Sequence, residues 1–350
     1  MVIKNIWGKI INELPERDRE VLIRHWGLEG EEEKLAEIGR DLGLTRERIR
    51  QIKERAVKQI VKGLEKEEIS GPFLNFVKER MSELGIRGEN KFEKILKEED
   101  KLPENEIKLV KKIIRVHPSI FHQEENESLR PFFSLEKEIF VSAKHALEKI
   151  KKYIAKNRLY NEDEILDIVS KEIRTHLRKK PALDELIEVL SLIKILAKNP
   201  LNHFGHIEHP LIAPDSLKGK LMAVLHHYKR PMHPNEIYQV LRELSQKDDE
   251  LIPSHWKKLG DIASIRNELI RSPEFVFVGK GHYGLREWGL EEGDAKTLMF
   301  NILKKEGKMP IDILWKKISS LRDIKKTSFY IYLKSSPRVI IKDKIVIYKR

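Results

Sequence analysis

Residues 43–60, GLTRERIRQIKERAVKQI, combine the side-chain types that recognise DNA bases with an apolar stripe at helical spacing. Between Leu44 and Lys62 the segment holds seven Lys or Arg residues and two acids. On a 3.6-residue period, the first turn and the face opposite the apolar stripe present Arg46, Glu47, Arg50 and Gln51. Arg can bond guanine in a fork, Gln can bond adenine, and Glu can accept from cytosine. The pattern predicts a helix whose outer face enters a DNA major groove.

A helix-turn-helix must position such a helix, and three residues fit its requirements. Gly39 is small where the two helices would cross, Gly43 suits the turn, and Ile49 would lock the helices together. A solvated basic helix could carry the same charge, but it would not need glycines at these offsets. The side chains expected to contact DNA phosphates, with Thr45 also capping the helix, are Thr45, Arg48, Lys53, Arg55 and Lys58.

Charge is unevenly distributed along the 350 residues, whose net charge is +12. Residues 294–350 hold 15 basic and 5 acidic side chains, so a polyanion is the expected partner. The chain has no cysteine, no apolar run long enough for a membrane helix and no signal-peptide pattern. We therefore expect a cytoplasmic, nucleoid-associated protein that binds double-stranded DNA and no membrane. The oligomeric state stays open.

The order of apolar patterns predicts a mainly α, multi-domain fold. Expected are a four-helix, helix-turn-helix domain closed by Ser70-Gly71-Pro72, a helical middle with an unassigned role, and two winged-helix modules with short β-hairpins. Acids of the middle domain alternate with lysines at helical offsets and are expected on solvated faces. The four domains are predicted at residues 1–68, 72–200, 214–290 and 294–350.

Each winged-helix module ends in two short strands around a basic tip. The tips contain Gly279-Lys280-Gly281-His282 in the first module and Lys342-Asp343-Lys344 in the second. The expected wing contacts to a groove or to phosphates are Lys280, His282, Lys342 and Lys344. Whether either wing binds DNA or protein stays open from the sequence.

Residues 14–60, which contain LTRERIRQI, resemble region four of the bacterial RNA polymerase sigma factors. The resemblance implies contacts with the −35 promoter element and with the polymerase flap, and base contacts by the residues at 46, 47, 50 and 51. Nothing in the sequence resembles the region-two helix that melts promoters. Residues 214–288 resemble, more loosely, the HARE-type winged helix. The prediction is a sigma-like transcription regulator. The alternatives are a polymerase-binding accessory or decoy protein, and the DNA-recognition arm of a restriction or defence system.

Catalytic and metal-binding patterns are weak. His203, His206 and His209 lie beside Glu208, but no helix fixes them and no cysteine assists, so we expect no metal there. GKGHYG lacks the Ser/Thr and the following helix of a phosphate loop. No nucleophile motif or nuclease-like carboxylate cluster is evident. We therefore expect no enzymatic activity and no cofactor.

Overall fold

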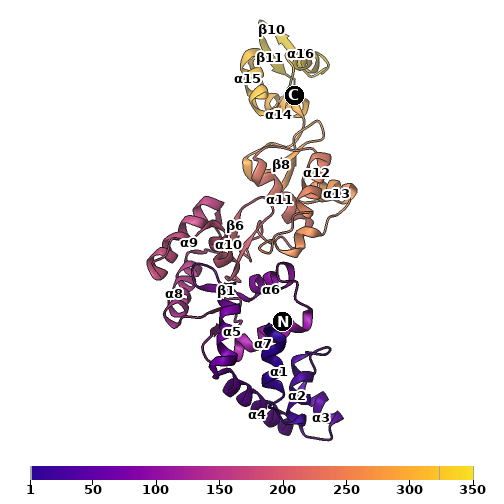
Figure 1. Ribbon diagram of the computed structural model, residues 1–350. Coiled ribbons are helices and arrows are strands. Elements are labelled where there is room, and N and C mark those ends of the chain that lie inside the picture. Colours follow the sequence, from indigo (N-terminus) through magenta and orange to yellow (C-terminus); the bar gives the residue numbers. More distant parts are fainter. Residues whose placement is uncertain (1, 323, 350) are drawn as a thin grey trace. The chain divides into compact units, whose positions relative to one another are not determined.

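The structure, a computed structural model, describes residues 2–322 and 324–349. The chain divides into two compact units: unit 1 comprises Met1–Ala155 and Tyr160–Leu196, and unit 2 comprises Lys156–Leu159 and Ala197–Arg350. Helices predominate and the strands are short (Figure 1), which confirms the predicted mainly α, multi-domain fold. Among the described residues, no helix is both long enough and apolar enough to cross a membrane.

The N-terminal part of unit 1 contains the helices that the sequence predicts. They are α1 (Val2–Ile11), α2 (Glu16–Trp26), α3 (Leu35–Asp41) and α4 (Arg46–Leu64). Helix α2 ends at Gly27, whose φ of 65° is a left-handed conformation that glycine adopts readily. Helix α4 begins after Thr45, whose Oγ1 accepts a hydrogen bond of 3.1 Å from the Arg48 backbone N–H.

Helix α5 (Glu67–Lys78) corrects the predicted end of the N-terminal domain. Residues 70–72 do not close the domain, because α5 runs through all three of them. Its buried side chains Ile69, Phe73 and Val77 recur every four residues. Burial of this stripe outweighs the backbone hydrogen bond that Pro72 cannot donate.

Helix α7 (Glu104–Val116) packs against the N-terminal helices in one continuous hydrophobic core. Its buried Ile107, Val110 and Ile113 belong to the same cluster as Ile10 of α1 and Ile60 of α4. Polar contacts reinforce the packing, since Lys112 Nζ lies 2.7 Å from Glu32 Oε1 and Lys108 Nζ donates to the Gly30 carbonyl at 3.2 Å. The predicted boundary between residues 68 and 72 therefore falls inside one core.

The rest of unit 1 consists of helices around a small sheet. Strands β1 (Ile86–Gly88), β2 (Phe121–Gln123) and β3 (Phe132–Ser134) are ordered β1-β3-β2. A further sheet, whose residues belong mostly to unit 2, has the order β4-β6-β5 and consists of β4 (Leu159–Tyr160), β5 (Leu196–Lys198) and β6 (Phe204–His206). The helices of this part are α6 (Glu89–Glu98), α8 (Lys137–Tyr153), α9 (Glu162–Leu177) and α10 (Leu183–Ser191).

Several acids of this middle segment are buried, which corrects their expected place on solvated faces. Glu89 accepts a hydrogen bond from Arg115 Nε at 2.9 Å, and its Oε1 lies 2.8 Å from His122 Nε2. Burial opposes ionisation of Glu89, yet the hydrogen bonds from His122 and Arg115 hold its pKa at about 2. Glu188 similarly accepts from Arg87 Nη1 at 2.7 Å and from the Gly88 N–H, which ties α10 to β1.

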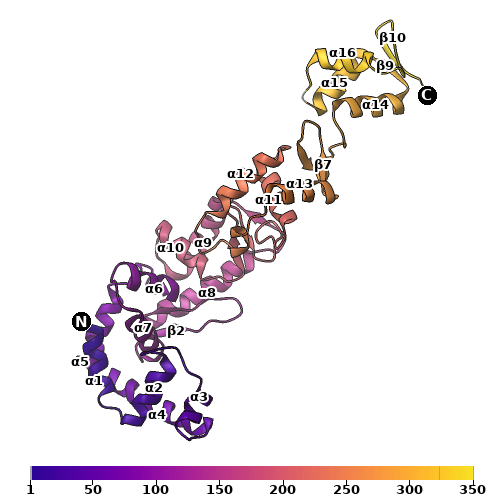
Figure 2. The same cartoon turned by 90° about the vertical axis from the view of Figure 1, so that its right-hand side faces the viewer.

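Unit 2 contains two helical modules, each followed by a hairpin and each with its own hydrophobic core (Figure 2). The first has three α-helices, two short 3-10 helices and a hairpin: α11 (Leu217–Tyr228), α12 (Pro234–Ser245), η1 (Ser254–Lys257), α13 (Ile262–Arg271), β7 (Phe275–Phe277), β8 (Tyr283–Leu285) and η2 (Arg286–Trp288).

The C-terminal module, residues 294–350, inserts a strand after its first helix. Its elements are α14 (Ala295–Glu306), β9 (Lys308–Pro310), α15 (Ile311–Leu321), α16 (Lys326–Lys334), β10 (Val339–Lys342) and β11 (Ile345–Tyr348). The sheet order is β10-β11-β9, so the hairpin pairs back onto the strand that follows α14. In both modules the order of helices and hairpin is the one predicted for a winged helix.

Candidate nucleic-acid interface

The turn between α3 and α4 depends on close backbone packing at Gly39. A Cβ added to Gly39 would lie 2.8 Å from the Leu44 carbonyl oxygen, closer than real Cβ contacts. Gly43 has a φ of 64°, and Ile49 is fully buried in a small cluster with Ile38 and Val21. The roles predicted for Gly39, Gly43 and Ile49 are therefore confirmed.

A Gly39→Ala substitution tests this packing. Alanine would normally stabilise a helix interior, but here its methyl group must displace the backbone at Leu44. We expect the free energy of unfolding to fall by about 1–3 kcal/mol, as measured by urea denaturation followed by circular dichroism. Gly8→Ala is the matched control, because a Cβ on this helical glycine of α1 meets nothing within 4 Å. Equal effects of the two substitutions would contradict the packing argument.

Salt bridges orient α3 against α2. Arg24 Nε donates to Glu33 Oε1 at 2.8 Å, and Arg24 Nη2 also bonds Asp41 at the end of α3. These bonds raise the pKa of Arg24, with the Glu33 hydrogen bond the largest cause. A single guanidinium thus holds both ends of the short helix that precedes the turn.

The four predicted base-contacting residues are exposed on α4. Arg50 lies between two acids of the same face: its Nε donates to Glu47 Oε2 at 2.9 Å, and its Nη1 bonds Glu54. Hydrogen bonding from Arg50 lowers the pKa of Glu47. Gln51 Oε1 accepts from Arg48 Nη1 at 3.2 Å. Donors and acceptors for base edges are therefore together on one surface, and their bonds are solvent-exposed pairs that a DNA duplex can replace.

Arg55 has a structural role that the sequence did not predict. Its Nε donates to Asp18 Oδ2 at 2.7 Å and its Nη2 bonds Asp18 Oδ1, while the Asp18 side chain is completely buried. This fork joins α4 to the first turn of α2. The guanidinium of Arg55 is therefore engaged by a buried carboxylate, and its contact with a DNA phosphate stays a prediction.

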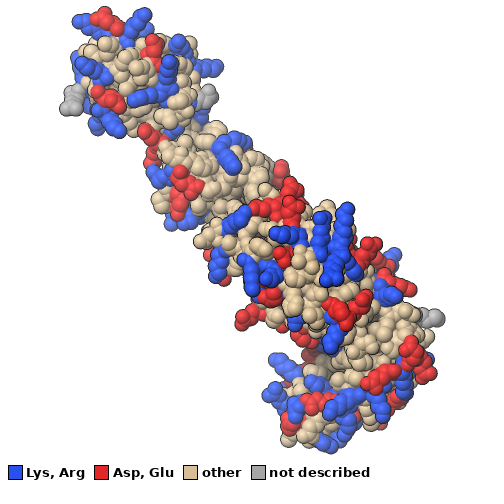
Figure 3. Space-filling model, turned by 90° about the vertical axis from the view of Figure 1, so that its left-hand side faces the viewer, with Lys and Arg blue, Asp and Glu red and all other residues tan. Residues whose placement is uncertain are grey.

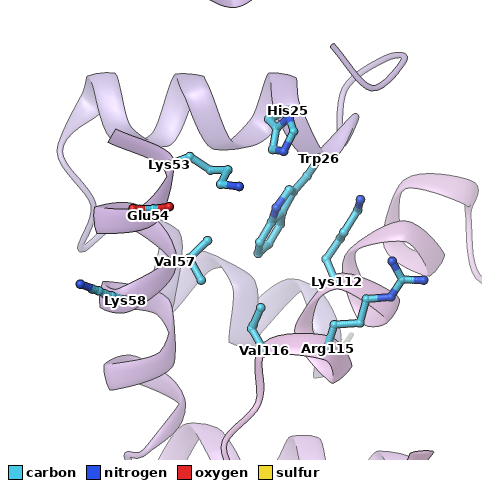
Figure 4. A pocket seen from close by; sticks show the side chains of 9 residues that line it. All are labelled: His25, Trp26, Lys53, Glu54, Val57, Lys58, Lys112, Arg115 and Val116. Carbon is cyan, nitrogen blue, oxygen red and sulfur yellow. The ribbon is translucent and has the colours of Figure 1, made fainter. Parts of the chain in front are cut away.

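The remaining predicted phosphate contacts differ in their surroundings. Arg48 and Lys58 are exposed, whereas Lys53 is half-buried. Lys53 points into a cavity of about 390 Å³ beside Trp26, while Lys58 points away from its centre (Figure 4). The cavity lies between α2, α4 and α7, and Val57 and Val116 contribute apolar wall to it. The Thr45 hydroxyl caps α4 through its oxygen, which leaves its proton available to a phosphate.

The predicted wing residues lie at two hairpin tips. His282 Nδ1 is 3.0 Å from the Lys280 carbonyl oxygen, and the His282 ring lies against that of His233, with 5.7 Å between centroids. Lys342 and Lys344 are exposed at either side of Asp343. The structure therefore pairs these four residues two by two, one pair at each tip.

The histidines that were considered for a metal have local structural partners. His206 Nδ1 accepts from the Glu208 N–H and His209 Nδ1 accepts from the Leu211 N–H, each at 3.1 Å. Burial lowers the pKa of both rings. Among the described residues, no group of three or more His, Asp or Glu side chains is arranged to hold a metal ion.

Comparison with known families bears on the same helices. The family Sigma-70, region 4 matches residues 10–62, which span α2, α3 and nearly all of α4. This confirms the resemblance of the N-terminal segment to sigma region four. The match gives these helices a helix-turn-helix, DNA-binding role in transcription, and it covers a minor part of the 350-residue chain.

Proposed function

We propose that this protein is a sigma-like transcription regulator that recognises −35-type promoter DNA through α4 and contacts RNA polymerase core during initiation. The observation that carries the proposal is the exposed row of Arg46, Glu47, Arg50 and Gln51 on a helix whose other face is locked by Ile49. The match of residues 10–62 to sigma region four supports it. In this proposal the protein is a DNA-binding regulator, with neither catalysis nor a cofactor.

Selection of binding sites from a random duplex library tests this proposal. The full chain should enrich a consensus similar to a −35 hexamer, and an Arg50→Ala, Gln51→Ala double variant should lose it. Each single substitution should cost about 1–3 kcal/mol at one base position, because a bidentate contact to that base disappears.

Lys58→Ala is the matched control on the same helix. It should weaken all sequences alike and reduce the salt dependence of log K by about 0.9, the contribution of one phosphate contact. If Arg50→Ala weakened consensus and random DNA equally, α4 would not be the recognition helix.

A polymerase-binding protein that does not read DNA on its own is the second candidate. It is favoured by the ion pairs of Arg50 with Glu47 and Glu54, which must break before Arg50 reaches a base. Co-purification with polymerase after nuclease treatment, together with no enriched DNA consensus, would replace the first proposal by this one.

A further inference from the structure

The C-terminal module carries a strong positive charge on a folded body. Its sequence has fifteen basic and five acidic residues. Lys and Arg side chains cover much of its surface at the upper left of Figure 3. Its buried core includes Leu298, Leu314 and Phe329, so the charge does not belong to a loose tail. Within the described part of the module, one ion pair is present, between Lys317 Nζ and Glu306 Oε1 at 3.6 Å. Most of its described lysines therefore have no ion pair with a described acid of the module.

The tip of its β10–β11 hairpin holds a lysine in an unfavourable backbone conformation. The register pairs Lys342 with Ile345, which leaves Asp343 and Lys344 as a two-residue turn with φ values of 49° and 63°. Asp-Gly is a strongly preferred sequence for such a turn, because most side chains disfavour positive φ. The Lys344 carbonyl accepts a hydrogen bond of 2.9 Å from the Ile311 N–H, which fixes the tip to the start of α15. The folded module would therefore be more stable with glycine at position 344 than with lysine.

The hairpin of the other module also has a lysine with positive φ at its tip. Lys280 has a φ of 50° between two glycines that also have positive φ. Arg178 and Lys229 have positive φ as well, but they end helices α9 and α11, where the partial negative charge of the helix end favours a cation. Lys344 is not at a helix end, so this compensation does not apply to it. A positive φ at this exposed hairpin tip points to a ligand-binding role for Lys344.

We propose that the C-terminal module makes a second contact with duplex DNA. It binds the phosphate backbone of the DNA independently of base sequence. In this contact Lys342 and Lys344 bind phosphates from the hairpin tip. Helix α16 supplies the outward-facing Thr327 and Lys334, with Ile331 63% exposed between them. A major groove accepts a helix or a two-stranded ribbon, and this module offers both.

The composition of the module explains why the contact would be independent of sequence. Twelve of its 15 basic residues are lysines, which bind phosphates as point charges and lack the fork with which arginine recognises guanine. Repeated phosphates on a duplex suit such scattered single charges. The inference goes beyond the proposed function, because it concerns another module and would hold even if α4 contacted no DNA.

Fluorescence anisotropy with the full chain tests the proposal. The probe is a duplex of about 25 base pairs without a −35-like sequence, measured over a salt series. A Lys342→Gln, Lys344→Gln variant should bind roughly tenfold more weakly, and its log K should depend on log salt with a slope smaller by about 1.8. Because the probe has no −35-like sequence, its binding does not depend on base recognition by α4, which separates this contact from the one proposed for α4.

A Lys304→Gln, Lys305→Gln variant is the matched control for charge. These lysines are exposed at the end of α14, and Gly307, which follows α14, pairs with Tyr348 at the end of the sheet opposite the hairpin tip. The control should lose less than about twofold in affinity. Equal losses for the two lysine pairs would mean diffuse attraction by net charge and would overturn a site at the tip. Tighter binding to single-stranded RNA or to polyglutamate than to the duplex would overturn the choice of DNA.

Lys344→Gly gives a second, independent test. It removes the strained side chain, so calorimetry of the full chain should show the C-terminal module melting roughly 2–4 °C higher. Affinity for the duplex should fall at the same time, by about threefold. A lower melting temperature or an unchanged affinity would contradict the proposed reason for the lysine.

Discussion

An Arg55→Ala variant should lose about 2–3 kcal/mol of unfolding free energy. Arg55 is the cation that bonds the Asp18 carboxylate, and the Asp18 side chain is completely buried. Removing the guanidinium leaves a buried negative charge without its partner, and such a charge costs several kcal/mol when nothing replaces the lost bonds. The expected loss of free energy is small for a buried ion pair because the Arg55 side chain is 52% exposed, so water can approach the vacated position.

Urea denaturation of a double-mutant cycle measures this effect. Asp18→Asn should restore much of the stability that Arg55→Ala removes, because the neutral amide needs no cation. Arg48→Ala is the matched control, an exposed arginine on the same helix, bonded to Gln51 rather than to a buried acid. Its effect should stay within about 0.5 kcal/mol. If Arg55→Ala also stayed within that range, Asp18 would need another source of stabilisation.

Unit 1 should lose about 2 kcal/mol of stability between pH 7 and pH 5 through His117. The ring is buried, its Nε2 lies 3.1 Å from Ser70 Oγ, and its Nδ1 accepts from the Ser119 N–H. Burial lowers the pKa of His117 from 6.5 to about 4. Because the folded-state pKa is the lower one, the contribution is complete above pH 6.5. It is lost as the pH falls toward 4, where the unfolded chain binds a proton that the folded chain excludes.

Two variants separate the contribution of His117 to the pH dependence of stability from the contribution of the buried acids. His117→Gln should reduce the loss between pH 7 and pH 5 by about 2 kcal/mol relative to the unmodified chain. His145→Gln, at an exposed histidine of the same unit, should leave the loss unchanged. A His117→Gln variant with the full pH dependence would show that the ring can be protonated in the folded state.

The helix-turn-helix could be predicted from sequence because its determinants are local. Gly39, Gly43 and Ile49 lie within eleven residues, and helical periodicity alone places Arg50 and Gln51 on the face opposite Ile49. The same reasoning gave the helices and hairpins of unit 2, where apolar periods change from helical to alternating spacing. In these segments the short-range pattern and the final packing agree.

Long-range pairings could not be predicted in this way. Asp18 and Arg55 are 37 residues apart, each within a run of charged residues, and nothing local distinguishes them from their solvated neighbours. Residues 70–72 looked like a terminator because Gly and Pro disfavour helices, but the buried Phe73 decides the outcome. Strands β1, β2 and β3 have three residues each, too few for an alternating pattern to appear.

The shared core of α7 with α1, α2 and α4 has a genetic consequence. A helix that contains no proposed DNA contact contributes Ile107, Val110 and Ile113 to the packing that holds α4 in place. A screen of random substitutions for loss of the proposed promoter recognition would therefore return polar replacements in α7 as well as changes on α4. Those two classes would separate by protein abundance in the cell, since only the α7 class would leave less folded protein.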